Sequence, residues 1–263
     1  MNPLNVRLMN NKQRGVSSLV LFLTGGYPAL ASTQDLVLGL EDGGADAVEI
    51  GMPFSDPMAD GAMIQRSSAV ALANGVTIPW IFEQVARLRQ RTSIPLILMG
   101  YVNPIFRYGV DRFFGDAAAA GVDGVILPEV PLGEWERFRG IVEARHLNGI
   151  LLVAPTTSPE RVRAIDEASS GFLYAVSSTG VTGGSPDGRA VEHMRETRKH
   201  VRKNPMLVGF GISTPEHAQM FAQVADGVVV GSALLRELEA GKGASEVAEW
   251  VRGFRVALDT RKR

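Results

Sequence analysis

The feature that most constrains this chain is a regular alternation of short apolar runs with longer amphipathic segments along its whole length. Each run is almost continuously apolar, which is typical of parallel strands covered on both faces rather than of half-exposed strands. We therefore expect strands, in chain order, at Leu19–Thr24, Ala47–Gly51, Pro95–Tyr101, Gly124–Glu129, Gly149–Pro155, Gly171–Ser177, Met206–Gly211 and Gly227–Ser232.

Helical patterns fill the segments between these runs. Several begin at a Ser or Thr followed by a proline, as at Ser158-Pro159 and Thr214-Pro215, and several end at a glycine such as Gly121. The predicted helices are Leu30–Glu41, Met63–Leu72, Ile78–Arg91, Val110–Ala120, Gly133–Arg145, Pro159–Ala168, Ala190–Lys203, Pro215–Val224 and, after the last strand, about Ala244–Leu258.

Strands joined by crossover helices form either a closed barrel or an open doubly wound sheet. A length of 263 residues and one helical block in each gap favour the closed α/β barrel, and no glycine-rich dinucleotide turn follows the first strand. No linker or change of composition divides the chain, so we predict a single (β/α)8 TIM-barrel domain over residues 1–263. Functional residues are then expected in the loops that follow the strands.

Charge and composition exclude several classes of function. The formal net charge is −1, which gives no attraction to nucleic acid or to an anionic membrane. The chain has no cysteine, which excludes thiolate catalysis, and its histidines show no metal-ligand spacing. No apolar stretch approaches the roughly 20 residues of a membrane span, and the N-terminus lacks a secretory pattern. We expect a soluble cytoplasmic protein without a bound metal.

Glu49 lies inside the otherwise apolar run Ala47–Gly51. Strand alternation places it on the same face as the small residues Ala47 and Gly51, which indicates the crowded barrel interior. Burial there would cost free energy and raise the pKa of the carboxyl, so that it could donate and accept a proton near neutral pH. A structural pairing with an arginine inside the barrel is the alternative interpretation.

Asp60 closes the proline-containing loop that follows this run, in which Ser55 and Asp56 are also polar. An Asp-Gly pair just before the helix predicted at Met63–Leu72 is typical of a helix cap or a turn. Its place after the second strand also makes it a candidate for the chemistry of a barrel site. The residues alone leave both interpretations open.

Glycine-rich loops follow the last three predicted strands: STGVTGG at 178–184, GFGIS at 209–213 and GSA at 231–233. Glycine lets backbone N–H groups approach an anion closely, and loops seven and eight commonly bind phosphate in such barrels. A single glycine pair is more often a tight turn, but three at adjacent strand ends favour a phosphate site. We expect backbone donors to hold the phosphate, with no arginine needed.

The loop after the second strand carries the most specific motif. Residues 49–61 read EIGMPFSDPMADG and are followed by Ile64-Gln65. This stretch closely resembles the signature of the tryptophan synthase α subunit family, and the resemblance extends in the same order from about Phe22 to Ser232. Further matching stretches are MGYVNP at 99–104, GVDGV at 121–125, GVTG at 180–183 and GFGIS at 209–213.

The resemblance implies a lyase that cleaves indole-3-glycerol phosphate to indole and glyceraldehyde 3-phosphate in tryptophan biosynthesis. Carried over by position, Glu49 matches the family's general acid/base and Asp60 its second catalytic carboxylate. Protonation of indole C3 and loss of the side-chain hydroxyl proton would let the C–C bond break, while Asp60 accepts the indole N–H. This chemistry needs neither a metal nor a Schiff base, in agreement with the absence of lysines at the predicted strand ends.

The resemblance also implies a partner and a set of substrate contacts. A pyridoxal-phosphate-dependent β subunit is expected, in an α2β2 assembly, and no cofactor in this chain. Thr182 would hydrogen-bond Asp60 when the sixth loop closes, and the stretch Gly180–Gly188 would act as a lid. The matched contacts are Phe22, Tyr101, Leu152 and Tyr174 around the indole, and Gly183, Gly211, Gly231 and Ser232 at the phosphate.

Three departures from the family's pattern leave both carboxylates in place. Glu129 stands where aspartate is usual, Ala62 replaces a common proline and Tyr27 replaces a frequent aspartate. Glu129 and Ala62 would flank the surface that faces the partner. Other interpretations are a stand-alone lyase that releases free indole, an allosteric or structural partner of a β subunit, and a phosphate-binding barrel isomerase. The isomerase would keep the glycine loops but has no use for the spacing of Glu49 and Asp60.

Overall fold

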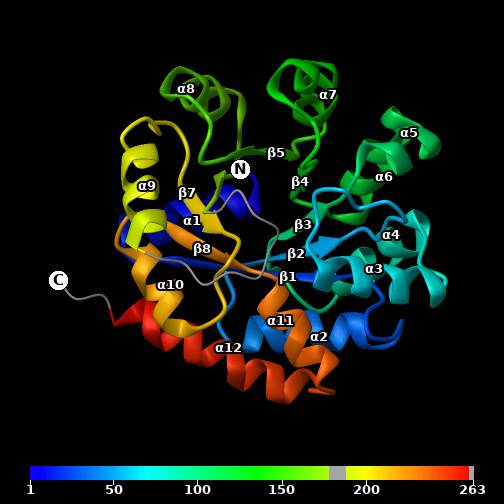
Figure 1. The fold of residues 1–263 in the computed structure, drawn as a ribbon. Helices are drawn as coiled ribbons and strands as arrows, with labels where there is room; N and C mark the ends of the chain where they lie inside the picture. The colour runs from blue at the N-terminus through cyan, green and yellow to red at the C-terminus, as the bar shows by residue number, and fades with distance from the viewer. Residues whose placement is uncertain (178–187, 261–263) are drawn as a thin grey trace.

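The computed structural model describes residues 1–177 and 188–260. Eight parallel strands close into a barrel in the order of the chain, with helices arranged around it (Figure 1). This topology confirms the predicted (β/α)8 fold and excludes the open sheet. The strands are β1 (Ser18–Thr24), β2 (Ala47–Gly51), β3 (Leu96–Met99), β4 (Gly124–Ile126), β5 (Asn148–Val153), β6 (Leu173–Val176), β7 (Met206–Gly209) and β8 (Gly227–Val230).

The helices follow the predicted pattern with three additions. The first is an N-terminal helix, the second opens the gap between β3 and β4, and the third directly follows β8. In the described parts of the chain the helices are α1 (Pro3–Gln13), α2 (Ser32–Asp42), α3 (Ala62–Ala73), α4 (Ile78–Leu88), α5 (Val102–Tyr108), α6 (Val110–Ala120), α7 (Leu132–Ala144), α8 (Pro159–Ala168), α9 (Gly188–Arg198), α10 (Pro215–Ala222), α11 (Ser232–Glu239) and α12 (Ala244–Asp259).

The expectation of one helical block in each gap is therefore wrong. Two helices, α3 and α4, separate β2 from β3, and α5 and α6 separate β3 from β4. Both α5 and α11 are short, at 7 and 8 residues, and each begins two or three residues after the end of a strand. In the sequence their apolar residues cannot be separated from those of the strand, so packing rather than periodicity determines that a helix forms there.

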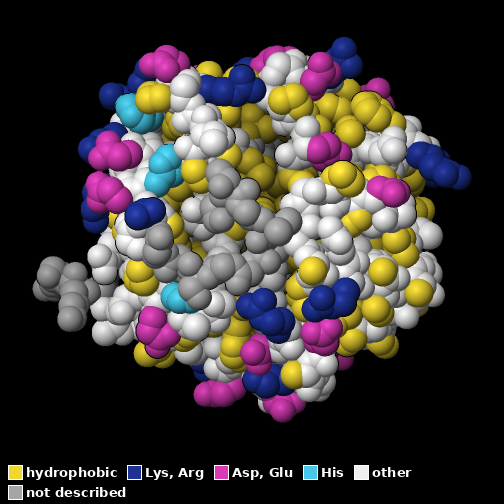
Figure 2. Space-filling view, viewed as in Figure 1, with side chains coloured by type: hydrophobic (Ala, Val, Ile, Leu, Met, Phe, Trp, Pro, Cys, Tyr) yellow, Lys and Arg dark blue, Asp and Glu magenta, His cyan; other side chains and the backbone are white. Residues whose placement is uncertain are grey.

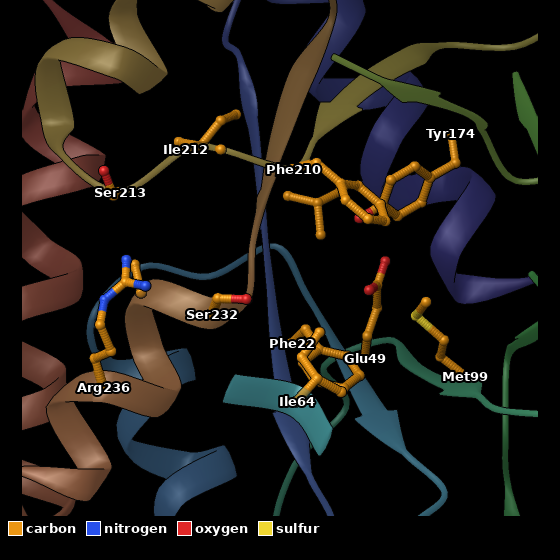
Figure 3. Close-up of a pocket in the computed structure, with 14 residues that line it drawn as sticks. Phe22, Glu49, Ile64, Met99, Tyr174, Phe210, Ile212, Ser213, Ser232 and Arg236 are labelled. Carbon is orange, nitrogen blue, oxygen red and sulfur yellow. The ribbon is translucent and has the colours of Figure 1, made fainter. Parts of the chain in front are cut away.

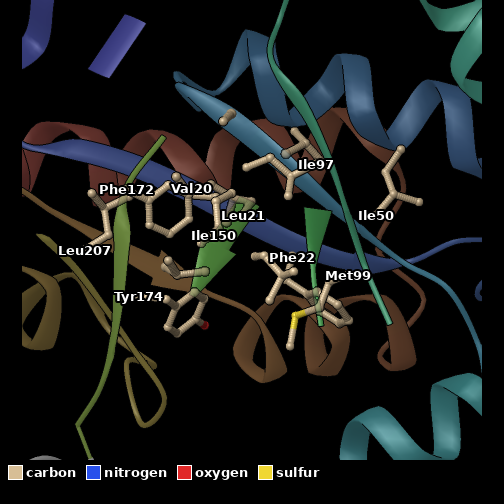
Figure 4. Packing of buried hydrophobic residues seen from close by; sticks show 14 of the residues in the cluster. Val20, Leu21, Phe22, Ile50, Ile97, Met99, Ile150, Phe172, Tyr174 and Leu207 are labelled. Carbon is tan, nitrogen blue, oxygen red and sulfur yellow. The ribbon is translucent and has the colours of Figure 1, made fainter. Parts of the chain in front are cut away.

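The barrel wall is buried from both sides, as the continuous apolar runs predict. Every residue of β1, β2, β3, β7 and β8 is buried. Inside the barrel, side chains from several strands meet, among them Phe22 of β1, Met99 of β3 and Tyr174 of β6 (Figure 4). Each large apolar side chain removed from water in this way contributes about 1.5–3 kcal/mol.

Helix α1 covers the end of the barrel where the strands begin. Asn2 caps this helix by accepting from Leu4 N, and its Nδ2 donates to the carbonyl oxygens of Asp123 (2.8 Å) and His146 (3.0 Å). Those two residues lie just before β4 and β5. Leu4 and Leu8 are fully buried, so the helix seals this end with apolar side chains. The opposite end, where the strands finish, carries the predicted functional loops.

Buried carboxylates near the starts of the strands all have partners. Asp123 forms an ion pair of 2.5 Å with Arg89, and Asp46 forms one of 3.2 Å with Arg255. Asp166 accepts hydrogen bonds from the backbone N–H groups of residues 202–204. These contacts offset the cost of removing a charge from water.

Helix α7 lies so close to β5 that only glycine fits at position 149. A Cβ added at Gly149 would lie 2.0 Å from Cζ2 of the buried Trp135, whereas Gly140, exposed within α7, has open space around it. Gly149→Ala should therefore lower the free energy of unfolding by about 1–3 kcal/mol through overpacking. Gly140→Ala should raise it by about 0.5–1 kcal/mol, because alanine loses less backbone entropy in a helix. Urea denaturation of both variants checks this, and equal effects would contradict it.

Candidate active site

On the face that Figure 2 shows, a hollow opens between the helices, and hydrophobic side chains form much of its visible wall. The candidate pocket is built from the ends of β1, β2, β3, β6 and β8, the loop after β7 and the first turns of α3 and α11. Figure 3 shows it with Glu49 on one side and α11 on the other. The lining residues are Phe22, Glu49, Ile64, Met99, Tyr174, Phe210, Gly211, Ile212, Ser213, Val229, Gly231, Ser232, Ala233 and Arg236.

Glu49 is fully buried in β2 and points into this pocket. Its strand neighbours in register are Phe22 of β1 and Ile97 of β3, neither of which can compensate a charge. Among the described residues, neither carboxylate oxygen has a hydrogen-bond partner and no arginine forms an ion pair with it. Burial therefore raises the pKa of Glu49 to about 8. The alternative of an interior glutamate–arginine pair finds no support in these residues.

Aromatic and apolar side chains enclose the Glu49 carboxyl. The ring of Phe22 lies across Gly51, where any Cβ would meet its Cζ at 2.6 Å. The ring of Tyr174 lies over Gly209, where a Cβ would meet the tyrosine hydroxyl at 2.3 Å. Burial, and then the charges of Glu49 and Asp60, raise the pKa of Tyr174 well above its ordinary value. The two glycines thus make room for flat side chains on either side of an acid.

Asp60 lies in the loop between β2 and α3 and is 8% exposed. It lines a small cleft beside the first pocket, and Phe22 and Met99 line both. Burial raises the pKa of Asp60 to about 6, against the opposing effect of a hydrogen bond from the Tyr101 hydroxyl. Gly61, not Asp60, occupies the N-cap position of α3, and no side chain caps that helix. The helix-cap interpretation of Asp60 is therefore wrong.

Tyr101 and Glu129 connect Asp60 to the next segments of the barrel rim. The Tyr101 hydroxyl accepts from the N–H of Ala59 at 2.9 Å, and the Tyr101 ring packs against Phe54 at a centroid distance of 5.3 Å. Glu129, after β4, accepts from the N–H of Val102 at 2.5 Å, at the start of α5. Its negative charge also raises the pKa of Asp60. Glu129, which stands where the family usually has aspartate, thus acts electrostatically on Asp60.

The glycine loops after β7 and β8 face the pocket from the side opposite Glu49. Gly211 has a φ of 77° and follows Phe210 at 70°, so the backbone here turns through the left-handed region. Gly231 is the N-cap residue of α11, and the Ser232 hydroxyl is buried without a partner among the described residues. A helix N-terminus and an unpaired hydroxyl together suit an anion.

The remaining predicted contacts are not among the described residues that line this pocket. Thr182, Gly183 and the proposed lid up to residue 187 lie outside the described residues. Leu152 pairs in register with Tyr174 but is half-buried and lines a different hollow, together with Pro128 and Val176. Its register with Tyr174 puts it on the same side of the sheet as that tyrosine, and its contact with the indole stays a prediction.

Sequence reasoning missed two polar groups of the pocket. Ser213 lines it, with its hydroxyl 3.2 Å from Nδ1 of His217. Arg236 lines it from α11, one helical turn after Ser232. The signal for Arg236 was its spacing of four residues from the predicted phosphate residue, which has meaning only if a helix begins there. Since α11 was not predicted, the spacing could not be used.

Two findings bear on other classes of site. Over residues 1–177 and 188–260, no group of three or more histidine, aspartate or glutamate side chains could hold a metal ion. Within the same residues, no helix is long and apolar enough to cross a membrane.

Comparisons with known proteins agree with the geometry. The family model described as tryptophan synthase alpha chain matches residues 8–257. A tryptophan synthase alpha chain of Geobacter sp. (strain M21) is 48% identical over 98% of this chain and 97% of its own length. The solved alpha chain of Legionella pneumophila subsp. pneumophila superposes with a TM-score of 0.89 at 35% identity, over 98% of both chains. A chain of Mycobacterium tuberculosis tryptophan synthase superposes with a TM-score of 0.89 at 34% identity, over 97% of both chains. The chain therefore belongs to the tryptophan synthase alpha chain family.

Proposed function

We propose that this chain is a lyase that cleaves indole-3-glycerol phosphate to indole and glyceraldehyde 3-phosphate, a step of tryptophan biosynthesis. The observation that carries the proposal is the fully buried, unpaired carboxyl of Glu49, which faces a helix N-terminus and glycine loops across one pocket. An acid at one end and an anion site at the other match a substrate with a reacting ring carbon and a terminal phosphate.

Glu49 is the group proposed to move protons at the carbon centre. With a pKa of about 8 it holds its proton at neutral pH and can donate it to indole C3, which gives an indolenine. The carboxylate so formed then accepts the proton of the hydroxyl on the adjacent side-chain carbon. That carbon becomes the aldehyde as the bond to C3 breaks, and the bonding pair returns to the indole. The proton count balances, since Glu49 donates one proton and recovers one.

Asp60 is proposed to accept a hydrogen bond from the indole N–H. Its pKa of about 6 leaves it mostly ionised at neutral pH, unlike Glu49. Positive charge develops on the indole nitrogen when C3 is protonated, and a nearby carboxylate stabilises it. The indole is proposed to contact Phe22, Tyr101, Leu152 and Tyr174, because flat apolar rings border both carboxylates and Leu152 is in register with Tyr174. The chemistry proposed requires no cofactor or metal in this chain.

The phosphate is proposed to lie against Gly211, Gly231 and Ser232, with Gly183 contributing from outside the described residues, where Thr182, the proposed partner of Asp60, also lies. The Ser232 hydroxyl and the N-terminus of α11 supply donors that need no rearrangement. With the phosphate there and indole C3 at Glu49, the glycerol chain would span the pocket. A barrel isomerase would use the same phosphate loops but would leave the Glu49–Asp60 pair without a task.

A pyridoxal-phosphate-dependent β subunit is the proposed partner, in an α2β2 assembly in the cytoplasm. Two large apolar side chains near the barrel rim support a docking surface there: Met58, in the Asp60 loop, is 89% exposed and Phe106, in α5, is 54% exposed. Methionine and aromatic side chains are enriched in protein interfaces relative to the rest of the surface. A stand-alone lyase and a mainly allosteric chain are the competing interpretations.

Glu49→Gln should abolish indole release, with a loss of at least about 100-fold in kcat, because the amide cannot shuttle a proton. The fold should persist, since glutamine has the same shape and avoids a buried charge. An indole-release assay together with circular dichroism checks this. Retained turnover in a folded variant would overturn the role of Glu49, and failure of the wild-type chain to release indole would overturn the proposed function.

The same substitution should change how stability depends on pH. Between pH 4.5 and about 8 the unfolded chain releases the Glu49 proton while the folded chain keeps it. This contribution to the free energy of unfolding is therefore complete below pH 4.5 and is lost as the pH rises through about 8, by up to about 1.4 kcal/mol per pH unit. Urea denaturation across this range should show a flatter profile for Glu49→Gln than for the wild type. Parallel profiles would contradict the burial of an ionisable Glu49.

The rate should depend on pH through both carboxyls. We expect kcat/KM for indole release to rise through about pH 6 as Asp60 ionises and to fall through about pH 8 as Glu49 loses its proton. Asp60→Asn should remove the low-pH limb and lower kcat by about 100-fold. A rate that falls below pH 6 equally in the Asn variant would assign that limb to another group.

A β subunit should bind the rim that carries Met58 and Phe106 and raise the rate of indole release. Phe106→Gln should weaken the association by about tenfold, as expected for a central apolar contact. Val256→Gln is the matched control, since Val256 is 65% exposed on α12, away from α5. Titration calorimetry and turnover with and without the β subunit check this. Unchanged turnover on mixing would favour the stand-alone lyase.

A further inference from the structure

Arg236 is the one cationic side chain among the fourteen residues that line the pocket. Glu49 is the one carboxylic acid among them and lies on the side of the pocket opposite Arg236 (Figure 3). The Arg236 side chain extends from α11 toward the loop that carries Ser213, on the side where Ser232 also lies. The pocket therefore has an acid at one end and a permanent positive charge at the other.

The carboxylates nearest to Arg236 in the sequence are engaged elsewhere. Glu239, three residues later, forms a 3.3 Å ion pair with Arg66 of α3, and Glu237 pairs with Lys242. In the described part of the chain, Arg236 itself takes part in no ion pair and donates no hydrogen bond to another side chain. Its guanidinium is thus available to a ligand in the pocket.

Other arginines on helices of this molecule form ion pairs within their own helix, whereas Arg236 forms none with the described residues. Arg87 pairs with Glu83 and Arg252 with Glu249, each within one helical turn. Such pairs are the ordinary arrangement on a solvated helix face. Glu239, the glutamate one turn after Arg236, pairs with Arg66 of α3 instead, so no described carboxylate forms an ion pair with the Arg236 guanidinium.

We propose that Arg236 binds the substrate's phosphate through its guanidinium and thereby makes the site specific for phosphorylated substrates. The proposal rests on the proposed function and deepens it. The sequence predicts that backbone donors hold the phosphate without an arginine, but backbone N–H groups and the Ser232 hydroxyl offer only partial charges, whereas a phosphate monoester carries about −1.5 to −2 charges at neutral pH. A planar guanidinium supplies a full charge and two parallel donors. Its position four residues after Ser232 puts it on the same face of α11.

A full charge at the mouth also acts before contact is made. An exposed cation attracts an anionic ligand over about 10 Å at 0.1 M salt, whereas hydrogen bonds act only at contact. The phosphate end of the substrate would therefore enter toward α11, and the indole end would be left to reach Glu49. Arg236 acts in this scheme on binding and orientation, and Glu49 on the reaction.

The test compares Arg236→Met with Arg252→Met, an exposed arginine of α12 outside the pocket, so that both variants lose one charge. Calorimetry with indolepropanol phosphate should show about tenfold weaker binding for Arg236→Met, the loss expected for one screened charge-assisted contact. Binding of unphosphorylated indolepropanol should be unchanged, and Arg252→Met should match the wild type with both ligands. Arg236→Lys should recover about half of the lost binding free energy, because it restores the charge without the fork.

In turnover, KM should rise for Arg236→Met while kcat changes less than about twofold, since the contact is made equally in the ground state and the transition state. Equal binding of indolepropanol phosphate by Arg236→Met and the wild type would overturn the proposal, as would an equal loss with both ligands. Inorganic phosphate and glycerol 3-phosphate separate this proposal from the proposed function. If they bind in an Arg236-dependent manner while no indole is released, Arg236 is an anion-binding residue and the lyase assignment fails.

Discussion

The burial of one carboxyl without a partner is the constraint on which the rest of the site depends. Asp46 and Asp123, near the starts of the strands, are also buried, but each forms an ion pair with an arginine. Glu49, near the ends of the strands, has apolar neighbours instead and keeps a proton at neutral pH. The same barrel therefore contains paired carboxylates that stabilise it and one carboxyl, Glu49, that lowers the free energy of unfolding at any pH above the pKa of glutamate in the unfolded chain. Such an unfavourable position persists where the group has a chemical task.

The fold could be predicted from the sequence to a large extent because the strands are covered on both faces. Continuous apolar runs mark such strands clearly, and Ala47–Gly51 is predicted to the residue. The short helices α5 and α11 could not be predicted, because each begins almost directly after a strand and lacks a side-chain cap such as Thr214, which marks the equally short α10. Their formation depends on packing against neighbouring strands and helices, which one sequence does not reveal.

A site residue could be predicted from the sequence where its side chain differs in polarity from the residues around it, and not where it resembles them. A glutamate within an apolar strand stands out, so Glu49 could be found from the sequence. Arg236, on an exposed helix face, looks like any solvated arginine until the pairing of Glu239 with Arg66 is known. Leu152, which the family resemblance places at the indole, is in register with Tyr174 but lines a neighbouring hollow, so its contact with the indole stays a prediction.

The two carboxyls differ because their environments differ, and this difference assigns their roles. Glu49 is enclosed by the barrel wall and has no donor among the described residues, so burial alone sets its pKa at about 8. Asp60 sits on a loop, where the Tyr101 hydroxyl favours the charged form and holds its pKa at about 6 despite the nearby charge of Glu129. At neutral pH Glu49 is therefore protonated and Asp60 ionised, a separation that a single site needs in order to protonate carbon and stabilise a cation together. Tyr101 stands directly before α5, whose first N–H binds Glu129, so a displacement of α5 would move the donor to Asp60 and leave Glu49 unchanged. A surface contact that acts on this site through α5 would thus change the environment of Asp60 and not that of Glu49.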